Sequence, residues 1–152
     1  MNAEKELEPL LIAIKAEKKA IEYYARAARR ITNPTGKEAL GKLKLQEEMH
    51  YRNLKKKFKK LTGRELRSED EKKVAVSVSA LTEEHLPDAE ASDLEVCQVA
   101  LDDEKNAHGF YLQSARNSGD AELKQLYEEL AKDELNHMGA IRGICKILSK
   151  PA

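Results

Sequence analysis

The two halves of the chain carry the same pattern of glutamate and histidine, offset by a constant 87 residues. The repeated residues are Glu17, Glu47 and His50 in the first half and Glu104, Glu134 and His137 in the second. Each one lies on a stripe of apolar residues whose spacing alternates between three and four, which is typical of the buried face of a packed helix. A fold that pairs the two halves therefore brings four carboxylates and two imidazoles into one core, and a helical bundle does so.

The apolar spacing predicts four long helices, and tight turns and caps separate them. Turn-forming sequences at Asn33–Gly36 and Asn117–Asp120 follow the first and third predicted helices. Gly63 suits the C-terminus of the second helix, and Ser92 with Glu95 forms a capping box at the start of the third. The predicted helices span residues of about 3–31, 37–61, 92–116 and 120–149. We expect two helical hairpins packed as an all-α four-helix bundle, in one domain covering residues 1–152.

Residues 64 to about 88 break the helical pattern. Val74, Val76 and Val78 alternate with small residues, and Pro87 follows. We expect an extended crossover with short strand character, and we place His85 in this loop. About 25 extended residues reach roughly 80 Å, whereas the second helix is only about 37 Å long, so the crossover can return the chain to the far end of the bundle.

Charge and composition exclude several classes of function. Lys+Arg and Asp+Glu balance at 27 each, so we expect neither nucleic acid nor an anionic membrane as a partner. No apolar segment has the length of a signal peptide or a membrane span, and we expect a cytoplasmic protein.

The two cysteines, Cys97 and Cys145, are too few for a four-cysteine metal site. Because both lie on apolar helix faces, we predict buried, reduced thiols.

The repeated glutamates and histidines suit a dimetal site. A buried ionised carboxylate costs several kcal/mol unless it is paired, and two divalent cations neutralise four of them. The Glu-x-x-His spacing puts both side chains of each motif on one helix face. We assign Glu47 and Glu134 as bridging carboxylates and the other four side chains as terminal ligands. This donor set favours two ions of iron or manganese, with zinc and cobalt as alternatives; surface or ion-paired roles are the competing interpretation.

Four segments carry a family resemblance. They are Glu17–Tyr24, Glu47–His50, Asp103–Lys105 and Asp133–His137. They resemble the bundle domain of the rubrerythrins, within the ferritin-like diiron carboxylate superfamily, and the resemblance covers essentially all the predicted helices. It implies a ferritin-like bundle with a non-haem dimetal centre that reacts with hydrogen peroxide or O2. Rubrerythrins typically reduce hydrogen peroxide to water, and related members oxidise Fe(II).

The chain departs from the rubrerythrin pattern in two places. It lacks the cysteines of the rubredoxin domain, so peroxide reduction would need an external electron donor such as a rubredoxin-type protein. Rubrerythrins also carry a further glutamate three residues after the ligand of the third helix, where this chain has Ala107. The adjacent His108 is either an additional ligand or proton donor, or a core histidine that is satisfied elsewhere.

Two tyrosines lie seven residues after repeated glutamates on the same helix faces. Tyr24 follows Glu17 and Tyr111 follows Glu104. Each is either a hydrogen-bond donor to a metal-ligating carboxylate across the core or a core aromatic whose hydroxyl finds another partner. We assign Tyr127 to packing.

We expect a redox enzyme of the peroxidase or oxidase type. Iron oxidation or storage, an organic oxygenase and a purely structural bundle are the alternatives. We also expect a homodimer, and the long crossover leaves open whether its hairpins exchange between chains.

Overall fold

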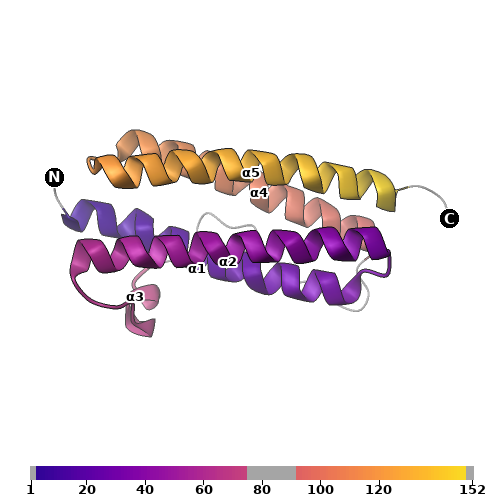
Figure 1. The fold of residues 1–152 in the computed structure, drawn as a ribbon, viewed down its shortest axis with the longest axis horizontal. Coiled ribbons are helices and arrows are strands. Elements are labelled where there is room, and N and C mark those ends of the chain that lie inside the picture. Colours follow the sequence, from indigo (N-terminus) through magenta and orange to yellow (C-terminus); the bar gives the residue numbers. More distant parts are fainter. Residues whose placement is uncertain (1–2, 75–91, 150–152) are drawn as a thin grey trace.

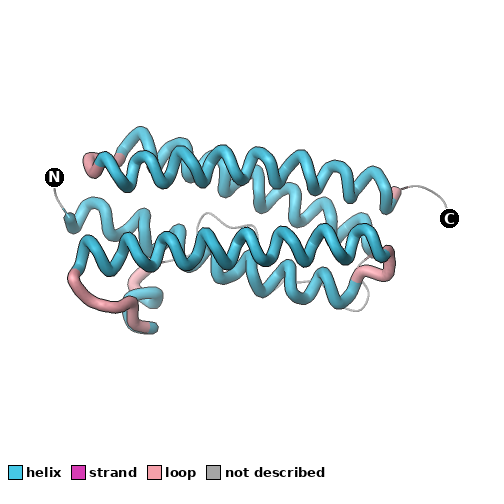
Figure 2. The backbone as a smooth tube through the Cα atoms, in the orientation of Figure 1, coloured by secondary structure: helices cyan, strands magenta, loops and turns pink. Residues whose placement is uncertain are grey.

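The computed structural model describes residues 3–74 and 92–149, and these are folded into helices and loops without a strand (Figures 1 and 2). The helices are α1 (Ala3–Arg30), α2 (Pro34–Thr62), the short α3 (Ser68–Lys72), α4 (Asp93–Asn117) and α5 (Ala121–Leu148). The predicted all-α, ferritin-like bundle is confirmed. None of the described helices is both long and apolar enough to cross a membrane.

The four long helices form two antiparallel hairpins that lie against each other (Figure 1). α1 packs chiefly on α2, and α4 packs chiefly on α5, while α2–α5 and α1–α4 contacts join the hairpins. Two apolar clusters fill the interior. One contains Ile14, Leu54 and Tyr127, and the other contains Tyr23 and Ile141. The repeated glutamates and histidines lie between these clusters along the bundle.

Helix α2 begins three residues earlier than the sequence predicts. Asn33 is its N-cap, and the Asn33 side chain accepts a hydrogen bond of 3.0 Å from the Gly36 amide. Pro34 occupies the first helical turn, where its missing N–H costs nothing. The predicted caps at Gly63, with φ of 74°, and at Ser92, with its capping box to Glu95, are confirmed.

The first part of the crossover is folded, which corrects the prediction of an extended chain from residue 64. The five-residue α3 is held by a bidentate ion pair from Arg64 to Asp70, at 2.8 and 2.7 Å. Lys15 of α1 donates a hydrogen bond of 2.9 Å to the Val74 carbonyl. Val76, Val78, His85 and Pro87 lie outside the described residues.

The prediction of reduced thiols is wrong. Cys97 of α4 and Cys145 of α5 form a disulfide, with Cα atoms 5.6 Å apart, within the normal range for such a bond. The two positions are at comparable distances on either side of the α4–α5 turn, so the antiparallel hairpin brings them together. The sequence prediction treated each cysteine separately and missed this register.

Candidate metal centre

The bundle gathers all six repeated side chains at one level of its core. Glu17 comes from α1, Glu47 and His50 from α2, Glu104 from α4, and Glu134 and His137 from α5. Each is at most 5% exposed. Burial of this many ionisable groups is unfavourable without a compensating partner.

The six side chains form two overlapping groups of potential ligands. Glu17 and His50 join Glu47 and Glu134 in one group, and Glu104 and His137 join the same two glutamates in the other. Within each group, the ligand atoms all lie within 4.8 Å of one another. The imidazole rings of the two groups are stacked, with centroids 5.6 Å apart. Glu47 and Glu134 therefore lie between two adjacent ligand sets.

Each of the six side chains has one buried polar atom without a hydrogen-bond partner in the described part of the chain. These atoms are Glu17 Oε2, Glu47 Oε1, His50 Nδ1, Glu104 Oε2, Glu134 Oε1 and His137 Nδ1. His50 Nδ1 is 3.3 Å from a Glu134 oxygen, and His137 Nδ1 is 2.9 Å from a Glu47 oxygen. Unsatisfied buried atoms are rare in folded proteins. Oxygen and imidazole donors facing one another in this way are compatible with a dimetal site.

Two tyrosines orient the outer carboxylates from across the core. Tyr111 donates a hydrogen bond of 2.6 Å to Glu17, and Tyr24 donates one to Glu104. The two bonds are related by the 87-residue repeat, and both were predicted as one of two alternatives. Burial, followed by the nearby carboxylates, raises the pKa of both tyrosines well above the ordinary value. Both hydroxyls therefore keep their protons and remain donors.

Asp133 holds the ring of His50, a contact that the sequence prediction missed. Asp133 Oδ2 lies 3.0 Å from His50 Nε2. When Nε2 carries the proton and donates it to Asp133, the lone pair of Nδ1 faces the carboxylates. The corresponding position beside His137 is Gln46, so the two halves differ here. Asp133 is 51% exposed, and no burial pattern singles it out.

Without metal, protons partly compensate the clustered charge. Burial raises the pKa of Glu17 to about 8, and the neighbouring Glu47 charge adds to this effect. Burial lowers the pKa of His137, but the bonds to Glu134 and Glu47 outweigh it and raise this pKa to about 9. At neutral pH the metal-free site therefore holds protons where cations would bind.

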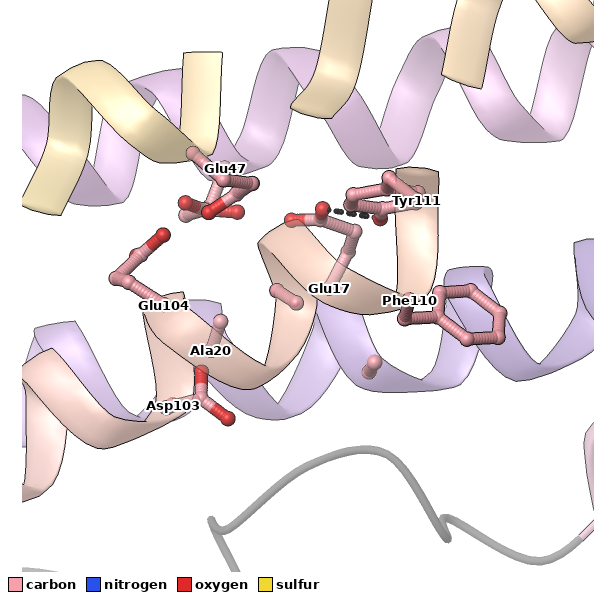
Figure 3. Close-up of a pocket in the computed structure, with 10 residues that line it drawn as sticks. Glu17, Ala20, Glu47, Asp103, Glu104, Phe110 and Tyr111 are labelled. Atoms are coloured by element: carbon pink, nitrogen blue, oxygen red, sulfur yellow. Dashed lines mark hydrogen bonds between the residues drawn. The ribbon is translucent and has the colours of Figure 1, made fainter. Parts of the chain in front are cut away.

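A small pocket of about 10 Å³ opens beside the carboxylates on the α1–α4 side. Figure 3 shows Glu17, Glu47 and Glu104 pointing toward one another, whereas Asp103 points away from them. Ala107 is among the small side chains that line this pocket. Such a volume is about that of one water-sized probe. On the α2–α5 side, both histidines line a separate surface pocket of about 280 Å³.

His108 lies apart from the two ligand groups. Its Nδ1 is 2.8 Å from the Ala131 carbonyl of α5, which it reaches as a donor. The residue is partly buried at the edge of the core stripe, because the central positions of α4 are Cys97, Ala100 and Glu104. Through this hydrogen bond, His108 links α4 to α5.

Comparison with known proteins agrees with the architecture and the residue pattern. The family model for rubrerythrin matches residues 8–145. The chain belongs to the rubrerythrin family. A solved structure of a hypothetical protein from Pyrococcus furiosus superimposes with a TM-score of 0.75 at 25% identity, covering 97% of this chain and 96% of that one. No curated protein matches the sequence.

Membership of the rubrerythrin family and the buried carboxylate and imidazole groups together indicate binding of metal ions. One departure from the rubrerythrin pattern, at Ala107, lies at the edge of the site. Ala107 leaves a methyl group beside the carboxylates, so this chain has no additional ligand at that position.

Proposed function

We propose that this rubrerythrin-family chain holds two iron ions and reduces hydrogen peroxide with electrons from an external donor. The observation that carries the proposal is the pair of ligand groups that share Glu47 and Glu134. We assign these two as bridging ligands, with Glu17 and His50 completing one site and Glu104 and His137 the other. Mixed carboxylate and imidazole ligands suit iron. When bound, iron supplies redox electrons and polarises substrate oxygens.

The protein orients the metal ligands and limits the size of the molecules that reach the site. The tyrosine hydroxyls hold one oxygen of Glu17 and one of Glu104, which fixes the orientation of both carboxylates beside the histidines. Asp133 fixes the ring of His50. Such surrounding partners set the basicity and direction of metal ligands. The narrow pocket beside Ala107 favours molecules as small as peroxide or O2 over an organic substrate.

Peroxide consumption coupled to donor oxidation tests the proposal. Protein loaded anaerobically with Fe(II) is given hydrogen peroxide and reduced methyl viologen. We expect two reduced methyl viologen molecules to be oxidised for each hydrogen peroxide consumed, because the donor gives one electron and the reduction of peroxide to water takes two. The variant Glu47→Ala, Glu134→Ala should lose this activity. The matched control Glu48→Ala, Glu128→Ala removes carboxylates from outside the core stripe of the same helices and should retain it.

Fe(II) oxidation is a second candidate. It is favoured by the carboxylates of Glu17, Glu47 and Glu104, which line the small pocket beside the site. Carboxylate oxygens attract divalent cations, and Fe(II) would then be a substrate. Supplying O2 with excess Fe(II) separates the functions. Oxidation of many Fe(II) ions per chain without an added donor would favour iron handling over peroxide reduction.

A further inference from the structure

The disulfide joins the same two helices that hold half of the candidate ligands. Cys97 precedes Glu104 by seven residues on α4, and Cys145 follows His137 by eight residues on α5. At 1.5 Å per residue, both cysteines are about 10 to 12 Å from the candidate centre along the helix axis. The chain contains no cysteines other than these two.

A continuous buried path connects the disulfide with the centre. Cys97 packs in the same apolar cluster as Tyr23 and Tyr24. Tyr23 donates a hydrogen bond of 2.6 Å to the carbonyl of Val96, the residue before Cys97. The rings of the two tyrosines are in edge contact at 5.9 Å, and Tyr24 donates to Glu104.

The two cysteines differ in exposure. Cys97 is 2% exposed, whereas Cys145 is only partly buried. Thiol–disulfide exchange begins with attack of a thiolate on an accessible sulfur, and Cys145 is the accessible one. Cys97 Sγ lies 3.4 Å from the Ile141 carbonyl, so a reduced Cys97 thiol has a hydrogen-bond acceptor already in place.

We propose that Cys97 and Cys145 form a dithiol–disulfide couple that supplies two electrons to the metal centre, with an external thiol as the final reductant. This inference rests on the proposed function. The two thiols lose two electrons and two protons as their S–S bond forms. These two electrons and two protons reduce one hydrogen peroxide, whose O–O bond breaks to give two water molecules. An external thiolate then attacks Cys145, a second thiol cleaves the mixed disulfide, and an external disulfide leaves.

Timed alkylation of the thiols tests the couple. Fully reduced protein, freed of reductant and loaded anaerobically with Fe(II), is given one equivalent of hydrogen peroxide. Free thiols are then counted by mass spectrometry. We expect two thiols lost per peroxide, about tenfold or more faster than in metal-free protein, because a thiol reacts with oxidants mainly as its thiolate and reacts poorly while it is protonated. The variant Glu47→Ala, Glu134→Ala should keep its thiols, and Glu48→Ala, Glu128→Ala should lose them.

The outcomes separate the two proposals. Loaded protein that consumes peroxide while both thiols persist would overturn the couple and leave the peroxide-reducing centre intact. Equal thiol loss with and without metal would overturn it too. Loaded protein that consumes no peroxide would overturn the proposed function itself. In a second measurement, Cys97→Ser, Cys145→Ser should lose dithiothreitol-dependent turnover by about tenfold or more, since this reductant acts at an accessible sulfur; unchanged turnover would contradict the couple.

Discussion

Replacing Tyr111 with phenylalanine should weaken the bundle by a predictable amount. The substitution keeps the ring but removes the hydroxyl that donates a hydrogen bond of 2.6 Å to the buried Glu17 carboxylate. At pH 9, above the Glu17 pKa of about 8, the acceptor is ionised. A hydrogen bond to a charged group contributes about 1.5–3 kcal/mol. For a domain of this size, 1 kcal/mol corresponds to about 2–4 °C, so Tm should fall by about 3–12 °C.

Tyr127 is a matched control in the same core. Its ring stacks on Tyr111 with centroids 6.0 Å apart, and its buried hydroxyl has no hydrogen-bond partner within the described ranges. Tyr127→Phe should therefore change stability by less than about 0.5 kcal/mol or increase it slightly. The assay is thermal unfolding of metal-free protein followed by circular dichroism. Equal Tm changes in the two variants, or no change in Tyr111→Phe, would show that the Tyr111–Glu17 hydrogen bond does not stabilise the bundle.

Measuring the unfolding of Tyr111→Phe at two pH values provides an internal check. At pH 6, Glu17 is protonated in the metal-free protein, because its pKa is about 8. The hydrogen bond from Tyr111 then ends on a neutral carboxyl group and contributes only about 0.5–1.5 kcal/mol. The destabilisation by Tyr111→Phe should accordingly be smaller at pH 6 than at pH 9. A pH-independent difference would show that Glu17 does not titrate in this range.

Four further predictions concern the centre and its support. Asp133→Asn should weaken metal affinity by about 10- to 100-fold, measured by chelator competition, because it perturbs the partner of His50. Metal binding should release protons and tighten as pH rises toward 9, seen with a pH indicator, since the pKa values of Glu17 and His137 are about 8 and about 9. As pH rises toward 9, metal-free protein should become less stable. The raised pKa values of Glu17 and His137 stabilise the folded state at low pH, and this contribution is lost as the two groups deprotonate in the folded protein. Glu6→Ala should cost about 3 kcal/mol or more in chemical denaturation without changing metal stoichiometry, because the buried Glu6 carboxylate accepts two hydrogen bonds from the α4–α5 turn.

The helices and the clustering of their polar core residues follow from local pattern. Apolar residues at spacings of three and four define the buried faces, and the repeat places matching side chains on matching faces. The reciprocal bonds from Tyr24 and Tyr111 follow from the same symmetry. These features depend on helix periodicity, which a single sequence displays directly.

The features that the sequence did not predict depend on contacts between distant segments. The short helix α3 is held by the Arg64–Asp70 ion pair, and the chain just after it is held by the bond from Lys15 of α1 to the Val74 carbonyl. Tertiary contacts of this kind leave no periodic signal. The disulfide depends on register across the α4–α5 turn. Asp133 is half exposed, so its contact with His50 emerges only when α2 and α5 lie side by side.

The number of bound iron ions tests whether the six buried side chains form a two-ion site. Wild-type protein and the variant Glu47→Ala, Glu134→Ala are loaded anaerobically with Fe(II), desalted and assayed for bound iron. Because the two ligand groups share these glutamates, we expect two ions per wild-type chain and loss of both in the variant. Equal iron in the two proteins, or none in the wild type, would contradict it.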